Sequence, residues 1–382
     1  MLSQGMRVVT LSILVVSALA LGACSKPYQK PQFDPDTTDF FGIEHALAQH
    51  GGASLITIHG MCHHTPTWFQ NAYERLAERL QAPRPNGWEF VPGNTSKVVT
   101  ALKTDIVRGD ETLRMYGIIY SNATKPSKVA NLCRDVNGGN AVCSQWQANH
   151  NRVRASFNNS LKNELLNDCL ADAVIYLGET GLTIREGVAS ALNAIYVDMA
   201  QHADLQHAPV MYLSESLGSK ILGDALVCAK PQITQRVYPE LGRTSHLFLG
   251  ANQVPLLNLG YRGPACPEVI RTERDDRPQQ EGYQGLAELI VRAQRLKTGE
   301  AISPTVVVAF TDPNDLLSYE VDEKDFAGLD VVNVIVSNDW TWFGVFENPL
   351  KAHVDYRDND TVSDLILCGR RGADDNNDCL PN

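Results

Sequence analysis

Ser216 lies at the point where an apolar run ends and a helical pattern begins. The run at residues 210–213 predicts a strand, and apolar residues then recur at helical spacing through residues 217–226. Between the two, the sequence S-E-S-L-G at 214–218 places a small residue two positions to either side of Ser216. A serine on such a strand-to-helix turn is a candidate nucleophile, because the turn exposes its hydroxyl to a nearby base. Taken alone, the pattern favours a serine that only satisfies backbone N–H groups at a helix start.

Candidates for a base and an orienting acid follow two later predicted strands. His353 comes after the strand predicted at 331–336, the last along the chain, and before the final helical pattern. An imidazole there can take the proton of a serine hydroxyl during attack on a carbonyl. Two acids, Asp312 and Asp315, follow the strand predicted at 306–310, and either carboxylate can hold the imidazole in the required tautomer. The other acid would then be a turn residue.

A fourth segment supplies backbone donors. The strand predicted at 55–58 leads into His59-Gly60-Met61, where the glycine permits a sharp turn. With Ser216, this order of parts resembles the α/β-hydrolase superfamily, whose G-x-S-x-G motif is here S-x-S-x-G. The resemblance implies hydrolysis of carboxylic esters through an acyl-enzyme, and a structural role for His59. It assigns Ser216 as the nucleophile, His353 as the general base, Asp315 as the orienting acid with Asp312 as the alternative, and the N–H groups of Met61 and Leu217 as oxyanion donors.

Apolar runs alternate with helical patterns through most of the chain. The runs lack polar alternation, which suits strands buried on both faces of a parallel sheet. They lie at 55–58, 210–213, 246–249, 306–310 and 331–336, with helical stripes at 68–80, 184–199 and 286–296. This order predicts an α/β fold with a mostly parallel, doubly wound sheet flanked by helices. The remaining patterns predict a hairpin or neighbouring strands at 101–107 and 113–119, an insertion or cap near 121–150, and strand or helix at 173–177.

The first residues predict export. Residues 8–21 are apolar and follow Arg7, and this stretch is shorter than the roughly 20 residues that span a bilayer. It ends in Leu21-Gly22-Ala23-Cys24, which resembles the lipobox of bacterial lipoproteins and implies lipid attachment to Cys24. A secreted protein with a chance cysteine is the alternative. Because aspartate does not follow Cys24, the resemblance favours the outer membrane of a Gram-negative cell envelope.

The predicted export sets the domain boundaries and the state of the cysteines. We divide the chain into a signal peptide at 1–23, a lipidated N-terminus and extended linker at 24–45, and one hydrolase-like domain at 46–382. The chain has 9 cysteines including Cys24, so an even number remains, as disulfides in an exported chain require. Two local pairs are predicted disulfides, Cys133 with Cys143 and Cys368 with Cys379.

Composition narrows the class of partner. The 382 residues are 43% hydrophobic and 20% charged, which is typical of soluble globular chains. The formal net charge is -11, so the surface repels phosphate backbones and anionic headgroups, and no nucleic acid partner is expected. The sequence contains no glycine-rich phosphate loop of the P-loop or dinucleotide type, and no cofactor is expected.

Two other interpretations compete with a serine hydrolase. The cluster His59, Cys62, His63 and His64 contains zinc-ligand types, but the adjacent histidines would compete geometrically and no second ligand pair follows at a zinc-finger spacing. A surface lipoprotein that uses the same fold as a binding or scaffold module is the second interpretation, because fold does not imply function. Catalysis requires that the serine, the histidine and an acid converge within hydrogen-bond reach.

Bulky apolar residues flank the predicted site segments and indicate the substrate class. They favour acyl esters, including lipids, over charged substrates, although packing in the core or at a loop base explains most of them equally well. Peptidase, thioesterase and acyltransferase chemistry would use the same groups. The residues are Trp68 and Phe69 after the glycine turn, and Trp340, Trp342, Phe343 and Phe346 before His353.

Overall fold

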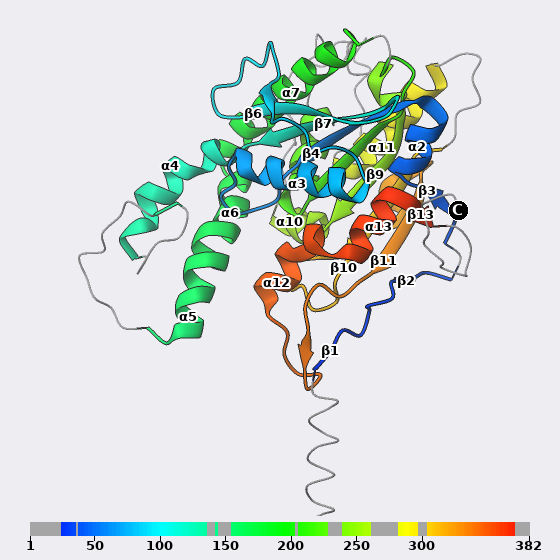
Figure 1. The fold of residues 1–382 in the computed structure, drawn as a ribbon. Coiled ribbons are helices and arrows are strands. Elements are labelled where there is room, and N and C mark those ends of the chain that lie inside the picture. The colour runs from blue at the N-terminus through cyan, green and yellow to red at the C-terminus, as the bar shows by residue number, and fades with distance from the viewer. Residues whose placement is uncertain are drawn as a thin grey trace, which may run out of the picture.

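The apolar runs predicted as strands form the centre of one mixed sheet with helices on both faces (Figure 1). The computed structural model describes residues 24–35, 37–135, 142–143, 154–202, 205–227, 239–260, 282–296 and 304–370. Among these residues, the strands join in the order β2-β11-β10-β9-β8-β4-β7-β6-β5. Their bounds are β2 (Gln32–Phe33), β11 (Asp330–Ile335), β10 (Val306–Thr311), β9 (Thr244–Gly250), β8 (Val210–Glu215), β4 (Gly52–Ile58), β7 (Glu111–Ile119), β6 (Thr100–Arg108) and β5 (Glu89–Phe90).

The middle of the sheet is parallel and its edges are antiparallel. Every pairing from β11 through β10, β9, β8 and β4 to β7 is parallel. β2 lies antiparallel against β11, and β6 lies antiparallel between β7 and β5. The predicted α/β class and parallel centre are therefore confirmed. Of the two arrangements left open for residues 101–119, the structure has the hairpin, β6 and β7, with Gly109 at φ 60 in its turn.

Two hydrophobic cores, one on each face of the sheet, explain why the strand runs do not alternate. In β8, Val210 and Tyr212 belong to one core, and Met211 belongs to the other. Since both faces are buried, successive residues of a strand are all apolar. One face packs against α7 (Thr180–Met199), α8 (Leu217–Val227) and α11 (Gly282–Leu296), and the other against α2 (Ile43–His50), α3 (Pro66–Arg79) and α13 (Asp360–Cys368).

A helical arm extends from the sheet on the side of α4 and α5 (Figure 1). Residues 173–177, left open between strand and helix, belong to helix α6. At the base of the arm, the buried Lys128 ammonium lies 2.7 Å from Asp172 Oδ1 and 3.2 Å from Asp168 Oδ1. The elements here are α4 (Ser121–Asn131), η1 (Cys133–Asp135), α5 (Ser156–Ser160), the π-helix η2 (Leu161–Leu170) and α6 (Ala171–Leu177). Much of the insertion predicted near 121–150 lies outside the described residues.

The segment predicted as a linker runs along the domain. β1 (Cys24–Ser25) pairs with β12 (Thr341–Trp342), and β3 (Phe40–Phe41) pairs with β13 (Gly369–Arg370). Between β1 and β2, Tyr28 N–H donates to Ser337 Oγ at 3.2 Å. The expectation of an extended segment holds only at β1 and β2: between them Gln29 N–H donates to Lys26 O at 3.2 Å in a turn, and residues 43–45 already belong to α2. Hydrogen bonds hold the segment against the fold. The other short elements are α10 (Val254–Gly260), η4 (Glu323–Phe326), α12 (Pro349–Val354) and η5 (Asp355–Asp358).

One predicted disulfide is present, and a second disulfide is one that the sequence did not indicate. Cys133 and Cys143 are bonded, as predicted. Cys62 is bonded to Cys169, so residues 107 positions apart join the turn after β4 to η2. Cys368 is also disulfide-bonded, whereas its predicted partner, Cys379, lies outside the described residues.

The predicted signal peptide, residues 1–23, also lies outside the described residues. Within the ranges given above, none of the helices is long and apolar enough to span a bilayer.

Candidate active site

Ser216 occupies a sharp turn between β8 and α8. Its φ of 51 lies in the left-handed region, which is costly for a residue with a Cβ, and its N–H donates to Gly250 O at 2.7 Å. Two glycines make room for this turn. A Cβ on Gly60 would lie 2.8 Å from Ser216 Cβ, and a Cβ on Gly218 would lie 2.4 Å from His59 O. The small residues around the serine are therefore required by the close approach of β4, β8 and α8.

Ser214 stands where the hydrolase motif has its first glycine, and the structure shows how a serine fits there. Its side chain is fully buried, and its hydroxyl lies 2.9 Å from Ser219 Oγ in the first turn of α8. A buried hydroxyl with a hydrogen-bond partner carries little penalty. The departure from the motif therefore leaves the turn intact.

The predicted serine, histidine and acid lie in one hydrogen-bonded row. Ser216 Oγ is 2.9 Å from His353 Nε2, and His353 Nδ1 is 2.8 and 2.9 Å from the two carboxylate oxygens of Asp315. All three side chains are buried. Since the carboxylate can only accept, Nδ1 carries the proton, and Nε2 is left to accept from the serine hydroxyl. This is the tautomer that a general base toward Ser216 requires.

Asp312, the alternative acid, faces a different set of partners. Its Oδ1 accepts from Asn314 N–H at 2.9 Å, and its Oδ2 accepts from Asn338 N–H at 2.6 Å. Burial raises the pKa of this carboxyl to about 7, although both backbone donors oppose the shift. Asp312 thus holds the loops after β10 and β11 together, while Asp315 contacts the histidine.

The peptide between Gly60 and Met61 is oriented by buried side chains. Gly60 O accepts from His59 Nδ1 at 2.6 Å and from the Tyr120 hydroxyl at 2.5 Å. In a trans peptide the N–H points opposite to the C=O, so the Met61 N–H points away from Tyr120. Gly60 and Met61 both line the serine cleft. Leu217, the second expected donor, is the first residue of α8, where N–H groups have no intrahelical acceptor.

The histidines beside this peptide are neutral and structural. His59 Nε2 accepts from Tyr120 N–H at 3.0 Å, and burial lowers the pKa of His59 well below its ordinary value. Burial also lowers the pKa of His64 to about 3, and its Nε2 donates to Met61 O at 2.9 Å. The Cys62 sulfur is committed to the disulfide with Cys169. In the described part of the chain, no three His, Cys, Asp or Glu side chains form a cluster that could hold a metal ion.

Two polar side chains in the site were not expected from the sequence. The Tyr356 hydroxyl donates to Asp315 Oδ2 at 3.1 Å and accepts from Asp312 N–H at 2.7 Å. Gln253 Nε2 lies 3.2 Å from His353 Nε2. For each of them, one feature of the sequence could have indicated its place in the site. Tyr356 follows the histidine by three positions, nearly one helical turn, and Gln253 follows β9, whose carboxyl end adjoins that of β8.

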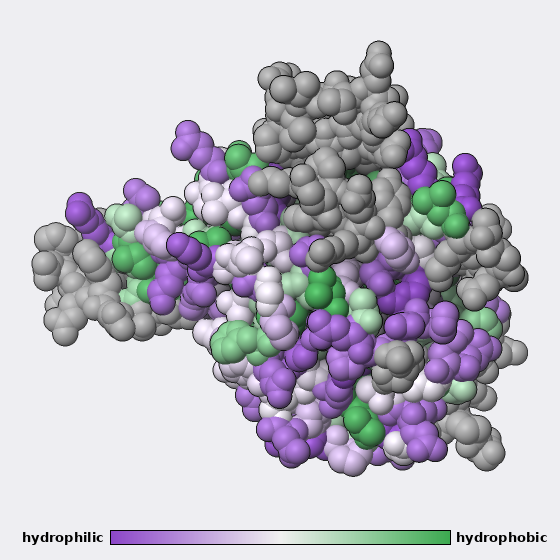
Figure 2. Space-filling view, turned by 90° about the horizontal axis from the view of Figure 1, so that it is seen from above, coloured by the Kyte–Doolittle hydropathy of each residue, from purple (hydrophilic) through white to green (hydrophobic). Residues whose placement is uncertain are grey.

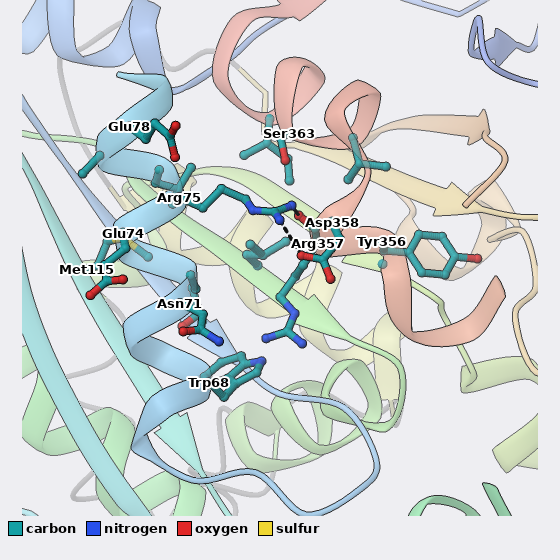
Figure 3. A pocket seen from close by; sticks show the side chains of 18 of the residues that line it. Trp68, Asn71, Glu74, Arg75, Glu78, Met115, Tyr356, Arg357, Asp358 and Ser363 are labelled. Atoms are coloured by element: carbon teal, nitrogen blue, oxygen red, sulfur yellow. Dashed lines mark hydrogen bonds and ion pairs between the residues drawn. The ribbon is translucent and has the colours of Figure 1, made fainter. Parts of the chain in front are cut away.

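Two cavities of very different size meet at the site. The cleft at Ser216 has a volume of about 40 Å³, and the cavity between α3 and α13 has a volume of about 680 Å³. Figure 3 shows the larger cavity, into which Trp68 and Asn71 project from α3 and Arg357 projects from η5. The side chains on its apolar wall are Leu76, Met115, Leu213, Phe310, Val362 and Ile366. The two cavities share Glu215, Gly250, Tyr356 and Arg357.

An ion pair separates these cavities. Arg357 Nε lies 3.1 Å from Glu215 Oε1, and its guanidinium carbon is 5.7 Å from the centroid of the Trp68 ring. Burial raises the pKa of Glu215, and the positive charge of Arg357 opposes that shift. Glu215 directly precedes the candidate nucleophile, so movement of this pair would change the wall of the serine cleft.

Comparisons with known proteins add no assignment. A scan against family models and searches of curated proteins and of solved structures gave no significant match. The function must therefore be argued from the geometry of the site.

Proposed function

We propose that the protein is a serine hydrolase of the α/β-hydrolase type that cleaves carboxylic esters. The observation that carries the proposal is the row from Ser216 through His353 to Asp315, beside an oriented peptide at Gly60 and Met61. A serine and a histidine without a catalytic role would not be expected to combine a strained turn, a buried carboxylate and a fixed histidine tautomer. A binding module with the same fold would not require this combination, so the convergence favours catalysis.

The chemistry follows from the roles that these groups can take. His353 Nε2 takes the hydroxyl proton while Ser216 Oγ bonds to the ester carbonyl carbon. The N–H groups of Met61 and Leu217 stabilise the resulting oxyanion, and each such donor is worth about 3–4 kcal/mol in known cases. The alcohol leaves with the proton from His353, and water then attacks the acyl-enzyme to release the acid and restore Ser216. Asp315 stabilises the imidazolium in both steps.

The larger cavity supports an apolar acyl group as the part of the substrate that confers selectivity. Its volume of about 680 Å³ is in the usual range for ligand sites, and its floor is apolar. Except for Glu78, the charged side chains that line it form ion pairs with one another, as in the contacts of Arg84 with Glu74 and of Arg75 with Asp358. An uncharged chain can enter without separating those pairs. We expect Ala72→Trp, which narrows the cavity, to shift preference toward shorter p-nitrophenyl esters.

Fluorophosphonate labelling tests the proposal without a guess about substrate. The full chain in detergent should label, and Ser216→Ala and His353→Ala should lose the label. Ser54→Ala removes another buried serine hydroxyl, near the start of β4 and away from the cleft, and serves as the matched control that keeps the label. If folded wild-type protein is not labelled, the binding-module interpretation replaces the hydrolase.

We also propose lipid attachment at Cys24, which places the enzyme on a membrane of the cell envelope. The supporting observations are the lipobox-like L-G-A-C sequence and the exposed, unbonded thiol of Cys24. Expression of the full chain in a Gram-negative host with labelled palmitate tests this. Incorporation should depend on Cys24 and should be lost in Cys24→Ser.

A further inference from the structure

The connection between β11 and α12 presents large apolar side chains to solvent. We call residues 340–346 the aromatic hairpin. Trp342 N–H donates to Phe346 O at 2.7 Å, and Phe346 N–H donates back to Trp342 O at 3.2 Å, so the hairpin is closed by its own backbone. The exposed fractions are 49% for Trp340, 54% for Trp342, 68% for Phe343, 86% for Val345 and 48% for Phe346. Monomeric soluble proteins rarely expose apolar residues in such a contiguous group.

Phe343 at the tip contributes little to the fold. Its φ is 54, a left-handed conformation that asparagine or glycine would adopt at lower cost. Its ring is mostly in water, so packing does not offset that strain. Strain combined with exposure indicates that this ring serves a contact outside the domain.

The aromatic hairpin lies directly beside the residue proposed to carry lipid. β1 pairs antiparallel with β12 so that Cys24 is opposite Trp342 and Ser25 is opposite Thr341. The Lys26 ammonium continues the contact by donating to Asn338 O at 3.3 Å. An acyl chain on Cys24 would therefore enter a bilayer next to Trp342.

We propose that the aromatic hairpin inserts into the interfacial region of a lipid bilayer beside Cys24. Trp side chains concentrate at that depth because the ring is apolar and its N–H still reaches water, and Phe343 and Val345 supply the apolar contact. With a net charge of -11, the protein gains nothing from anionic headgroups, so insertion must be driven by apolar burial in zwitterionic lipid. The inference shares Cys24 with the proposed anchor and does not depend on the esterase chemistry.

Among the described residues, no comparable apolar group is seen at the opposite end of the molecule. Figure 1 shows β1 and α12 at the same end, and Figure 2 views the molecule from the other end. There, hydrophobic side chains of the described residues are scattered singly among hydrophilic ones. Since α12 carries His353, docking through the hairpin would place the site close to the lipid surface.

Quenching of tryptophan fluorescence by brominated lipid tests insertion. The full chain is bound to phosphatidylcholine vesicles whose acyl chains carry bromine near the headgroup. We expect quenching in the wild type and a clearly smaller quenched fraction in Trp340→Phe/Trp342→Phe. Of the other three tryptophans, Trp68 is buried, Trp88 is partly buried against the core, and Trp146 lies outside the described residues. Added phosphatidylglycerol should not increase the quenching.

A matched pair of phenylalanine variants tests the role of the tip. Phe343→Asn suits the positive φ and should reduce quenching while leaving the unfolding temperature unchanged or higher. Phe90→Asn removes a ring that is 64% exposed on the edge strand β5, and should leave quenching unchanged.

Three results would overturn the proposal. One is a chain that attaches to vesicles without quenching, which rejects insertion but leaves the anchor intact. Another is the same quenched fraction in wild type and in the double tryptophan variant. The third is a dimer in detergent that Phe343→Asn dissociates, because the hairpin would then contact a second copy of the chain.

Discussion

The two sides of the serine cleft are built by different means. The donor side, residues 59–64, is held by the disulfide from Cys62 and by neutral buried side chains. The proton-transfer side, residues 312–356, is held by groups that ionise or bridge ionising groups, among them Asp312, Asp315 and Tyr356. Loss of the disulfide should therefore impair the donor side. The proton-transfer side should be sensitive to the replacement of single side-chain atoms and to pH.

The difference matches what the proposed mechanism requires of each side. Donors for an oxyanion must be in position before the charge develops, so fixed backbone and neutral supports suit them. Proton transfer needs a base whose tautomer is controlled by a charged neighbour. Each of the following experiments changes one side and leaves the other as its reference.

Removing the charge that contacts His353 should have the largest effect. Asp315→Asn puts an amide at His353 Nδ1 and favours the wrong tautomer, and we expect a drop of about 10⁴-fold in kcat/KM toward p-nitrophenyl esters. Asp312→Asn, three residues earlier in the same loop, is the matched control. Its kcat/KM should fall by less than about 10-fold, because Asp312 contacts backbone N–H groups and not His353. Equal losses in the two variants would contradict the assignment of the acid.

Removing the cross-link should have the next largest effect and should act on the donor side. Cys62→Ser/Cys169→Ser frees the peptide at Met61, and a displacement of about 1 Å can cost about 100-fold in rate. A loop near 100 residues also contributes about 4.7 kcal/mol to the free energy of unfolding in the chain-entropy view.

The control for this cross-link is Cys133→Ser/Cys143→Ser, which opens a loop with a sequence separation of 10 in the arm. It should lose less than about 3 kcal/mol and keep its activity. Urea unfolding and steady-state rates measure both variants. Wild-type rates in folded Cys62→Ser/Cys169→Ser would show that the donor side needs no clamp.

Removing the Tyr356 hydroxyl should have a smaller effect, on the proton-transfer side. Tyr356→Phe takes a donor from Asp315 and leaves Asp312 N–H without its acceptor, and we expect about a 10-fold lower kcat with little change in KM. Tyr196→Phe removes a buried hydroxyl elsewhere and should leave kcat unchanged. An unchanged kcat in folded Tyr356→Phe would contradict a contribution of its hydroxyl to the position of Asp315.

The pH dependence of stability tests Asp312 on the proton-transfer side without any measurement of activity. Asp312 has a folded pKa of about 7 against an ordinary value of 3.8, so the folded state keeps a proton that the unfolded state has already lost. This group's contribution to stability is therefore greatest below about pH 4 and decreases as pH rises toward 7. Relative to Asp312→Asn, the wild type should become less stable between pH 5 and pH 8. Urea unfolding at the two values measures this, with the exposed Asp110→Asn as control. A constant difference between wild type and Asp312→Asn would contradict the raised pKa.

Much of the fold, and the three side chains that converge at Ser216, could be predicted because they depend on local pattern and chain order. Buried strands gave uninterrupted apolar runs, and the turn at Ser216 left small residues at fixed positions. The choice between Asp315 and Asp312 could only be ranked, since both follow β10 and only the three-dimensional turn decides which one meets His353.

Other features depend on contacts between distant segments, and the sequence could not reveal them. The pairing of Cys62 with Cys169 requires η2 to lie beside the turn after β4, across 107 positions of sequence. Helix α6 was ambiguous because its short apolar run fits either a strand or a helix. The run at residues 25–32 is polar and rich in proline, which predicts a linker, whereas its backbone groups pair with the domain.

The attached path of that N-terminal segment limits how far the domain can move from Cys24. Residues 26–31, if free and extended, would span about 20 Å and would let the domain sweep a broad volume above its anchor. Bonded to Ser337, Asn338 and Thr361, they allow no such excursion. An enzyme anchored at Cys24 would thus work at one fixed height, and its substrates would have to diffuse to it within or along the membrane plane.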